Sequence, residues 1–139
     1  MAETLRDVMT RNPATLDSEA TVAEAARLMR DRDIGDVLVT DSGAIRGIVT
    51  DRDLVVRVLA DGRDPAATRL AAIASEEIES LPPTASVKEA VDLMMKRALR
   101  RIPVVEHDRA IGIVAIGDLA VDRDSKSALG QISAADPNR

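Results

Sequence analysis

The chain repeats one sequence pattern after 65 residues, and this duplication limits the folds that it can adopt. Residues 47–54 read GIVTDRDL, and residues 112–119 read GIVAIGDL. Aligning residues 5–58 with residues 70–123 without a gap gives 16 identical pairs among 54 positions. A period of 65 residues is too long for the stacked repeats of a solenoid. It indicates two copies of a small α/β unit that share one core.

The length of the chain favours two units that depend on each other. About 65 residues alone would bury only a marginal core, so we expect the copies to pack together, most simply about a pseudo-two-fold axis. The turn-forming segment 62–65 (GRDP) separates them. We predict a first unit with a leading helix over residues 1–64 and a second unit over residues 65–124. Residues 125–139 lack hydrophobic periodicity, which predicts a mobile tail.

Each copy is predicted to fold as β-α-β-β-α behind a short leading helix, which is an α/β (α+β) pattern. The central helix of each copy begins at a capping box, Thr21 with Glu24 and Ser86 with Glu89. Gly35 is predicted to end the first of these helices. The other predicted elements are leading helices at 5–9 and 68–74, short strands at 15–16 and 79–81, hairpins of 37–40 with 45–50 and of 102–105 with 110–115, and closing helices over 51–59 and after residue 118.

The composition argues against several kinds of function. The chain has no Phe, Tyr or Trp and a net charge of −5, so it lacks the aromatic rings and the basic surface that nucleic-acid binding requires. It has no Cys and one His, His107, without partners at ligand spacing, so we expect no metal site. The sequence contains neither a phosphate loop nor an evident acid–base pair, so no motif indicates an enzyme. With no signal sequence and no apolar run near ~18 residues, we expect a cytoplasmic protein without a nucleic-acid or membrane partner.

The duplicated motifs resemble those of the cystathionine β-synthase (CBS) domain pair, the Bateman module. In each copy a helix begins S/T-V-x-E-A, at Thr21 and at Ser86, and a strand ends in the pattern G-h-h-T-x-x-D-L, where h is hydrophobic and the second copy has Ala in place of Thr. The resemblance covers residues 5–123. It implies a regulatory module that binds adenosine-containing ligands, such as AMP, ADP, ATP or S-adenosylmethionine, in clefts between the two copies. It also implies a homodimer.

The resemblance further implies which residues would hold the ligand. Asp53 and Asp118 would accept hydrogen bonds from ribose hydroxyls, and Thr50 would add a contact. We consider Arg52 and Arg101 as candidates for a phosphate, which a guanidinium group can bind bidentately. Five residues of the strands complete the predicted ligand-binding set: Thr15, Leu16, Val37, Ile102 and Pro103.

A structural role is an alternative for each of these residues. Thr50 and Asp53 also match a capping box, although Asp118 is retained opposite an alanine, which favours a second role for the carboxylate. Arg101 suits the C-terminal end of the preceding helix, and the strand residues suit a hydrophobic core. Pro103 predicts an edge strand or a strand start, because proline has no N–H for a neighbouring strand.

We therefore expect a stand-alone regulatory protein that binds an adenosine-containing ligand between its copies and signals occupancy to a protein partner by a population shift. The alternative is a ligand-free scaffold whose function resides in its dimer surface. The fold alone does not distinguish the two. An enzyme is the least favoured interpretation.

Overall fold

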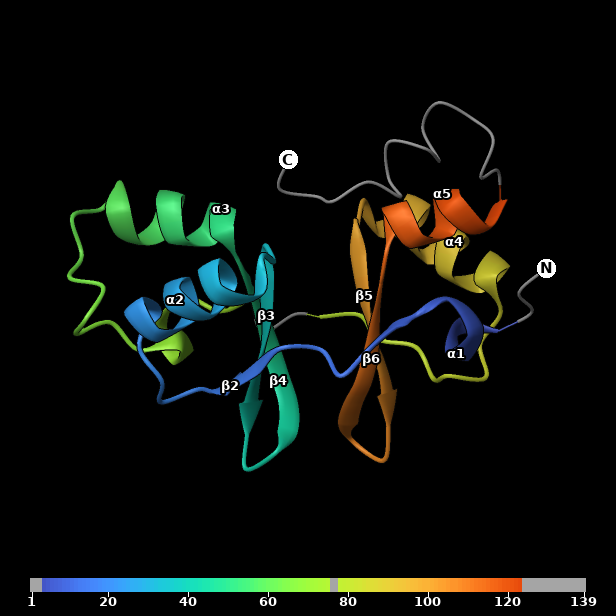
Figure 1. The fold of residues 1–139 in the computed structure, drawn as a ribbon, viewed down its shortest axis with the longest axis horizontal. Helices are drawn as coiled ribbons and strands as arrows, with labels where there is room; N and C mark the ends of the chain where they lie inside the picture. The colour runs from blue at the N-terminus through green and yellow to red at the C-terminus, as the bar shows by residue number, and fades with distance from the viewer. Residues whose placement is uncertain (1–3, 76–77, 124–139) are drawn as a thin grey trace. The chain divides into compact units, whose positions relative to one another are not determined.

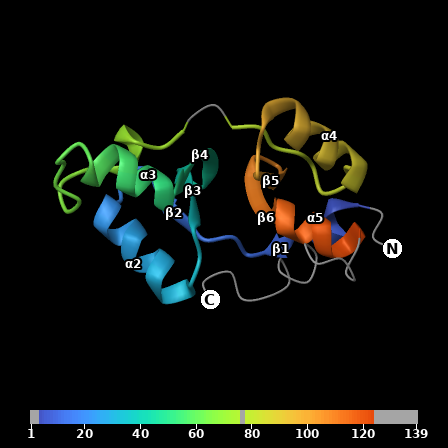
Figure 2. The same ribbon diagram turned by 90° about the horizontal axis from the view of Figure 1, so that it is seen from above.

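The computed structural model describes residues 4–75 and 78–123, and the chain forms two compact units with a three-stranded sheet in each. The first-copy unit comprises residues 14–78, and the second-copy unit comprises residues 1–13 together with 79–139. The fold is mixed α+β, as predicted. In each unit the longer helices lie on one face of the sheet (Figures 1 and 2). The predicted tail at 125–139 falls outside the described residues.

The first-copy unit is built on a sheet with the order β2-β3-β4. β2 (Thr15–Asp17) pairs parallel with β3 (Asp36–Asp41), and β3 forms the predicted hairpin with β4 (Ala44–Thr50). The crossover between the parallel strands is α2 (Val22–Arg32). The core of the unit consists of buried apolar side chains from the helices and the sheet: Val22, Ala25, Met29, Val37, Val39, Val49, Val58, Leu70 and Ile73.

The second-copy unit has the sheet order β1-β6-β5, in which every pairing is antiparallel. Its core lies between this sheet and the helices and is again built from aliphatic side chains and methionine. The predicted strand at 79–81 is reduced to one bridge between Leu81 and Val104. The elements of the unit are α1 (Leu5–Val8), β1 (Thr10–Arg11), α4 (Val87–Arg97), β5 (Arg101–Glu106), β6 (Arg109–Ala115) and α5 (Ile116–Arg123).

The leading segments of the two copies are exchanged, which differs from the predicted boundary at residue 64. Leu5 of α1 is fully buried in the second-copy core, and β1 pairs with β6 through Thr10 and Ile113. The equivalent leader of the second copy, the 3₁₀ turn η2 (Leu70–Ala72), belongs to the first-copy unit, where Ser75 pairs with Ile48. Since 75 and 48 are the positions equivalent to 10 and 113, each copy supplies the leader that completes the other copy's sheet.

The exchanged leaders explain the glycine that opens each G-h-h-T-x-x-D-L motif. A Cβ atom at Gly47 would lie 2.5 Å from the carbonyl oxygen of Ser75, which is closer than van der Waals contact permits. A Cβ atom at Gly112 would overlap the thioether of Met9. Glycine is therefore required at residue 47, where the backbone of a leader passes directly over the strand. At residue 112 it is favoured, because a Cβ atom there would displace the Met9 side chain.

The starts of α2 and α4 are as predicted. The end of α2 is not, and α5 begins at Ile116 rather than after residue 118. The hydroxyl of Thr21 accepts from the N–H of Glu24 at 3.2 Å, and the Glu24 carboxylate accepts from the N–H of Thr21 at 2.7 Å. The Ser86 box is formed in the same way. However, α2 ends at Asp33 in the left-handed conformation (φ 58°) rather than at Gly35. The equivalent Ala98 (φ 55°) ends α4.

The closing helix of the first copy is not an α-helix throughout. It begins as α3 (Asp51–Asp53) and continues as the π-helical segment η1 (Leu54–Leu59), in which the N–H of Ala60 donates to the carbonyl of Val55 at 2.8 Å. Such π segments are rare and often occur beside functional sites. In the part of the chain that the structure covers, no helix has the length and hydropathy to cross a bilayer.

Candidate ligand-binding site

The turn from β4 into α3 holds the carboxylate of Asp53 in a fixed orientation. Oδ2 of Asp53 accepts a hydrogen bond from the backbone N–H of Thr50 at 2.8 Å and another from its hydroxyl at 3.0 Å. The Thr50 hydroxyl in turn accepts from the N–H of Asp53 at 3.2 Å. The capping box predicted as an alternative is therefore formed. It does not use the second oxygen of the carboxylate.

The second oxygen, Oδ1 of Asp53, faces Arg57 one helical turn later. The Nε atom of Arg57 lies 3.8 Å from Oδ1, and the Asp53 side chain is 23% exposed. Nη1 of Arg57 donates to the carbonyl oxygen of Ile73 at 3.0 Å, in the exchanged leader. Arg57 is not among the predicted site residues, although its i, i+4 spacing from Asp53 is a signal for an ion pair.

The second copy retains half of this cap. Oδ2 of Asp118 accepts from the backbone N–H of Ala115 at 2.8 Å, the same distance as in the first copy. Ala115 cannot donate a side-chain hydrogen bond, but the carboxylate still satisfies a free N–H at the start of α5. The retention of Asp118 is therefore explained by capping, and it does not by itself favour a second role.

The other first-copy candidates occupy different parts of their unit. Thr15 and Leu16 lie on β2, where Thr15 is exposed and Leu16 packs on the core. Val37 is fully buried, so it contributes to the core rather than to a surface. Arg52 is exposed at the tip of the turn beside Asp53. The turn thus brings together Thr50, Arg52 and Asp53.

The second-copy candidates are divided between the core and the start of β5. Ile102 and Pro103 are buried. Pro103 lies on β5, which is an edge strand of its sheet, as its missing N–H predicts. Arg101 is half-buried and pairs in register with Ala115. Because α4 ends at Arg97, Arg101 is not in the last turn of the helix, and that alternative is wrong.

The acidic character of the first-copy turn was also missed. Asp51 begins α3, and its carboxylate lies over Gly35, where a Cβ atom would be 3.1 Å from Oδ2. The equivalent positions in the second copy are Ile116 and Arg100. The backbone contact is nevertheless the same, since the N–H of Asp51 donates to Gly35 and that of Ile116 donates to Arg100. The two turns therefore share a backbone geometry but differ in charge.

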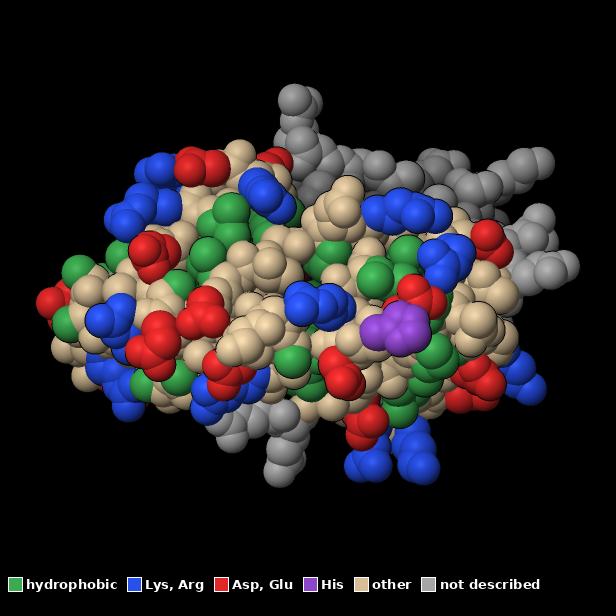
Figure 3. Space-filling model, turned by 90° about the horizontal axis from the view of Figure 1, so that it is seen from below, with side chains coloured by type: hydrophobic (Ala, Val, Ile, Leu, Met, Phe, Trp, Pro, Cys, Tyr) green, Lys and Arg blue, Asp and Glu red, His purple; other side chains and the backbone are tan. Residues whose placement is uncertain are grey.

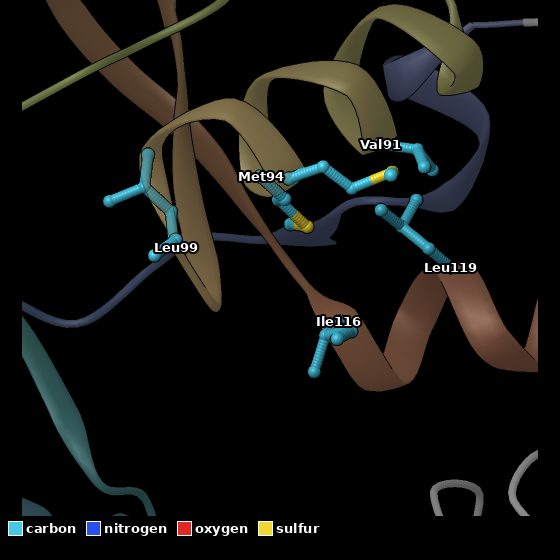
Figure 4. A pocket seen from close by; sticks show the side chains of 7 residues that line it. Val91, Met94, Leu99, Ile116 and Leu119 are labelled. Carbon is cyan, nitrogen blue, oxygen red and sulfur yellow. The ribbon is translucent and has the colours of Figure 1, made fainter.

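The second-copy unit carries an apolar hollow between α4 and α5, with a volume of about 430 Å³. Figure 4 shows Met94 and Val91 of α4 facing Leu119 of α5 across it. Two large apolar side chains of its lining are unusually exposed, Met95 at 77% and Ile116 at 57%. Exposed apolar surface of this kind is typical of an interaction site.

No metal site is evident in residues 4–75 and 78–123, where no group of three or more His, Cys, Asp or Glu side chains could hold an ion. His107 lies in the exposed turn between β5 and β6 with φ 54°.

Two copies of a sheet-and-helix unit, each with a hairpin that leads into a capped aspartate, define a tandem α+β module of the CBS type. The sequence profile of the CBS domain matches residues 5–60 and again residues 70–122. The chain belongs to the CBS domain family.

Similar proteins share this arrangement over most of their length. The chain is 38% identical over 126 residues to CBS domain-containing protein YhcV of Bacillus subtilis, covering 91% of this chain and 89% of that protein. It is similar to the structure of a protein with CBS domains from Burkholderia ambifaria, with 30% identity, a TM-score of 0.80 and coverage of 89% of this chain and 96% of that chain. It is also similar to the hexameric CBS-CP12 protein from bloom-forming cyanobacteria, with 30% identity, a TM-score of 0.76 and coverage of 86% and 67%.

Proposed function

We propose that this chain is a regulatory CBS-pair protein that binds the ribose of an adenosine-containing ligand through Asp53. The observation that carries the proposal is the unequal use of the two carboxylate oxygens. Oδ2 is fixed by two hydrogen bonds from Thr50, whereas Oδ1 has one ion-pair contact at 3.8 Å. A carboxylate accepts about four hydrogen bonds, so Oδ1 retains the capacity to accept from a ribose hydroxyl. The cap and the ligand would thus use different oxygens.

Arg57 offers a route by which occupancy would reach the rest of the unit. A hydroxyl bound to Oδ1 would weaken the ion pair with Arg57, and the same guanidinium holds the carbonyl of Ile73. Ligand binding would then alter how the leader around Ser75 is held against β4. Signalling to a protein partner requires that the ligand bind one of two conformations more tightly than the other.

Calorimetric titration of the whole chain with AMP, ADP, ATP and S-adenosylmethionine tests the proposal. We expect Asp53→Asn to weaken binding about tenfold or more, because hydrogen bonds to a charged group contribute about 1.5–3 kcal/mol. Glu24→Gln is the matched control, since Glu24 occupies the same position of a capping box in the same unit. No heat at millimolar ligand, or equal weakening by both variants, would refute the proposal.

The apolar hollow supports a second candidate function, a dimeric scaffold. We infer that a second copy of this chain covers the α4–α5 face, because Met95 and Ile116 expose apolar surface to water there. Self-association is known for a relative, the hexameric CBS-CP12 protein. If the scaffold is the whole function, Asp53→Asn leaves partner capture unchanged, whereas disruption of the α4–α5 face abolishes capture.

A further inference from the structure

A second hollow lies at the hairpin end of the second-copy sheet, at the opposite end of β5 and β6 from Asp118. Its volume is about 530 Å³, and it is bordered by the segment from α1 to β1 and by the hairpin of β5 and β6. Its charged lining consists of Arg6, Arg11, Arg109 and Glu106. Met9 and Ile111 supply the apolar part. Hollows of roughly 300–1,000 Å³ are typical of small-molecule sites.

The charge of this hollow is not balanced by the protein itself. Arg6 and Glu106 form an ion pair, with Nη2 and Oε2 separated by 3.3 Å. Across residues 4–75 and 78–123, the side chains of Arg11 and Arg109 have neither an ion pair nor a hydrogen bond. The only other acidic group of the hairpin turn is Asp108, which is exposed outside the lining. Two exposed guanidinium groups of the lining are thus without an acidic partner among the described residues.

The charged lining of the hollow is positive on balance, with three arginines and one glutamate. Figure 3 shows Lys and Arg side chains, with Asp and Glu side chains among them, around the single histidine, which marks the turn between β5 and β6. This local positive charge stands out in a chain with a net charge of −5. Positive charge concentrated in a hollow attracts anions more strongly than scattered surface charge does.

The fold does not require these arginines, as the first copy demonstrates. The positions equivalent to Arg6, Arg11 and Arg109 are Ala71, Glu76 and Ala44. The acidic residue is retained, since Asp41 is equivalent to Glu106 and pairs with Arg46 at 3.5 Å. A structural ion pair therefore exists at this corner in both copies, whereas the additional guanidinium groups occur only in the second-copy unit.

The strand pairing holds the arginines near one another. Arg11 lies opposite Gly112 in the pairing of β1 with β6, and Arg109 begins the same β6 strand. Met9 is only 9% exposed and packs over Gly112, which anchors the chain just before Arg11. The backbone on both sides of the hollow is thus fixed by packing.

We propose that this hollow binds the phosphate group of a small phosphorylated molecule, at a site independent of Asp53. Guanidinium groups present paired N–H donors that match phosphate oxygens. A tetrahedral phosphate accepts such pairs from two directions at once, which suits arginines placed on different strands better than a planar carboxylate does. Glu106 repels the anion but is neutralised by Arg6.

Titration of the full chain with inorganic pyrophosphate, followed by amide NMR, tests the proposal. Saturable shifts are expected at Arg11, Gly112 and Arg109. The double variant Arg11→Gln/Arg109→Gln is expected to weaken binding at least tenfold. The matched control is Arg27→Gln/Arg63→Gln, which removes the same charge from exposed positions of the first-copy unit and is expected to change the affinity less than twofold.

Further ligands separate the possible sources of the signal. ATP is expected to shift the same amides even in the Asp53→Asn variant, whereas adenosine is not. Citrate tests for a carboxylate preference. The proposal is overturned if pyrophosphate gives no saturable shift at millimolar concentration, if citrate binds more tightly, or if the control variant weakens binding as much as the Arg11 and Arg109 variant does. Asp53→Asn leaves the arginine-lined hollow intact. A failure of the phosphate proposal is therefore distinguishable from a failure of the ribose proposal.

Discussion

The guanidinium of Arg57 donates a hydrogen bond to the carbonyl oxygen of Ile73 at 3.0 Å. Ile73 is 2% exposed and lies in the leader that follows the link between the two copies. Through Arg57, the turn that carries Asp53 is therefore tied to a segment that completes the same unit. The second copy has Asp122 at the position equivalent to Arg57, so this connection is specific to the first copy.

Replacing Arg57 by Gln should lower the free energy of unfolding by about 1 kcal/mol. Charged hydrogen bonds contribute about 1.5–3 kcal/mol, but the Arg57 side chain is 53% exposed, and solvent screening reduces the effect. Urea denaturation measures the change. Arg27→Gln, an exposed site on α2, is expected to have no measurable effect. Faster amide exchange at Ser75 should accompany the loss, and unchanged exchange there would contradict the proposed connection.

The helix caps at Asp53 and at Asp118 predict opposite changes in stability when the residue three positions before each aspartate is replaced. Thr50→Ala removes the hydroxyl that accepts from Asp53, and we expect a loss of about 1 kcal/mol. Ala115→Thr places a hydroxyl beside Asp118, whose carboxylate already accepts from the backbone of residue 115, so we expect a gain of about 0.5–1 kcal/mol. Chemical denaturation measures both changes. Destabilisation by both substitutions would show that the second-copy turn does not tolerate a complete capping box.

The two motif glycines differ in what a methyl group would meet. Gly47→Ala would drive Cβ into the Ser75 carbonyl, which belongs to the backbone, whereas Gly112→Ala would meet first the flexible side chain of Met9. We expect a loss of about 2–3 kcal/mol for Gly47→Ala and about 1 kcal/mol for Gly112→Ala, because overpacking costs about 1–3 kcal/mol. Thermal unfolding establishes the order. The reverse order would indicate that the leader of the second copy is the more adaptable of the two.

The exposed apolar face of α4 and α5 predicts a dimer that one charge disrupts. Met95→Glu places a carboxylate on the α4–α5 face, and burial of an unpaired charge is costly. Sedimentation velocity should show a dimer for the original chain and a monomer for Met95→Glu at the same concentration. Lys96→Gln changes the net charge equally at a neighbouring exposed position and should remain dimeric. A dimer with Met95→Glu would place the interface elsewhere.

Short-range patterns predicted the local structure well. The capping boxes at Thr21 and Ser86 and both hairpins depend on residues within a few positions of one another, and all four are present. The end of α2 was missed because Asp33, rather than Gly35, adopts the left-handed conformation, as Ala98 does at the end of α4. There the N–H of Ile34 bonds back to Met29 and that of Leu99 to Met94, each at 3.0 Å. An apolar residue just after the helix is the signal for such an ending.

Long-range features could not be predicted from one sequence. Leu5 and Leu70 occupy equivalent positions, and each sheet has a glycine-opened strand that a leader can join, so the local pattern does not decide which leader joins which sheet. The long-range contacts of the candidate site also could not be predicted from local patterns. The spacing of Thr50 and Asp53 predicted their turn, but the target of Arg57 is a carbonyl group 16 residues away that tertiary packing positions.

The exchange of leaders has a consequence for how the protein is made. Thr10 pairs with Ile113, a partner that the ribosome adds about a hundred residues later. During synthesis the amino-terminal segment therefore cannot pack into its unit until nearly the whole chain has emerged. Until then the apolar side chains of Leu5 and Met9 are exposed to solvent. The first-copy unit, residues 14–78, contains all of its own strands and can form earlier. The amino-terminal segment should therefore pack into its unit only after the second copy has emerged.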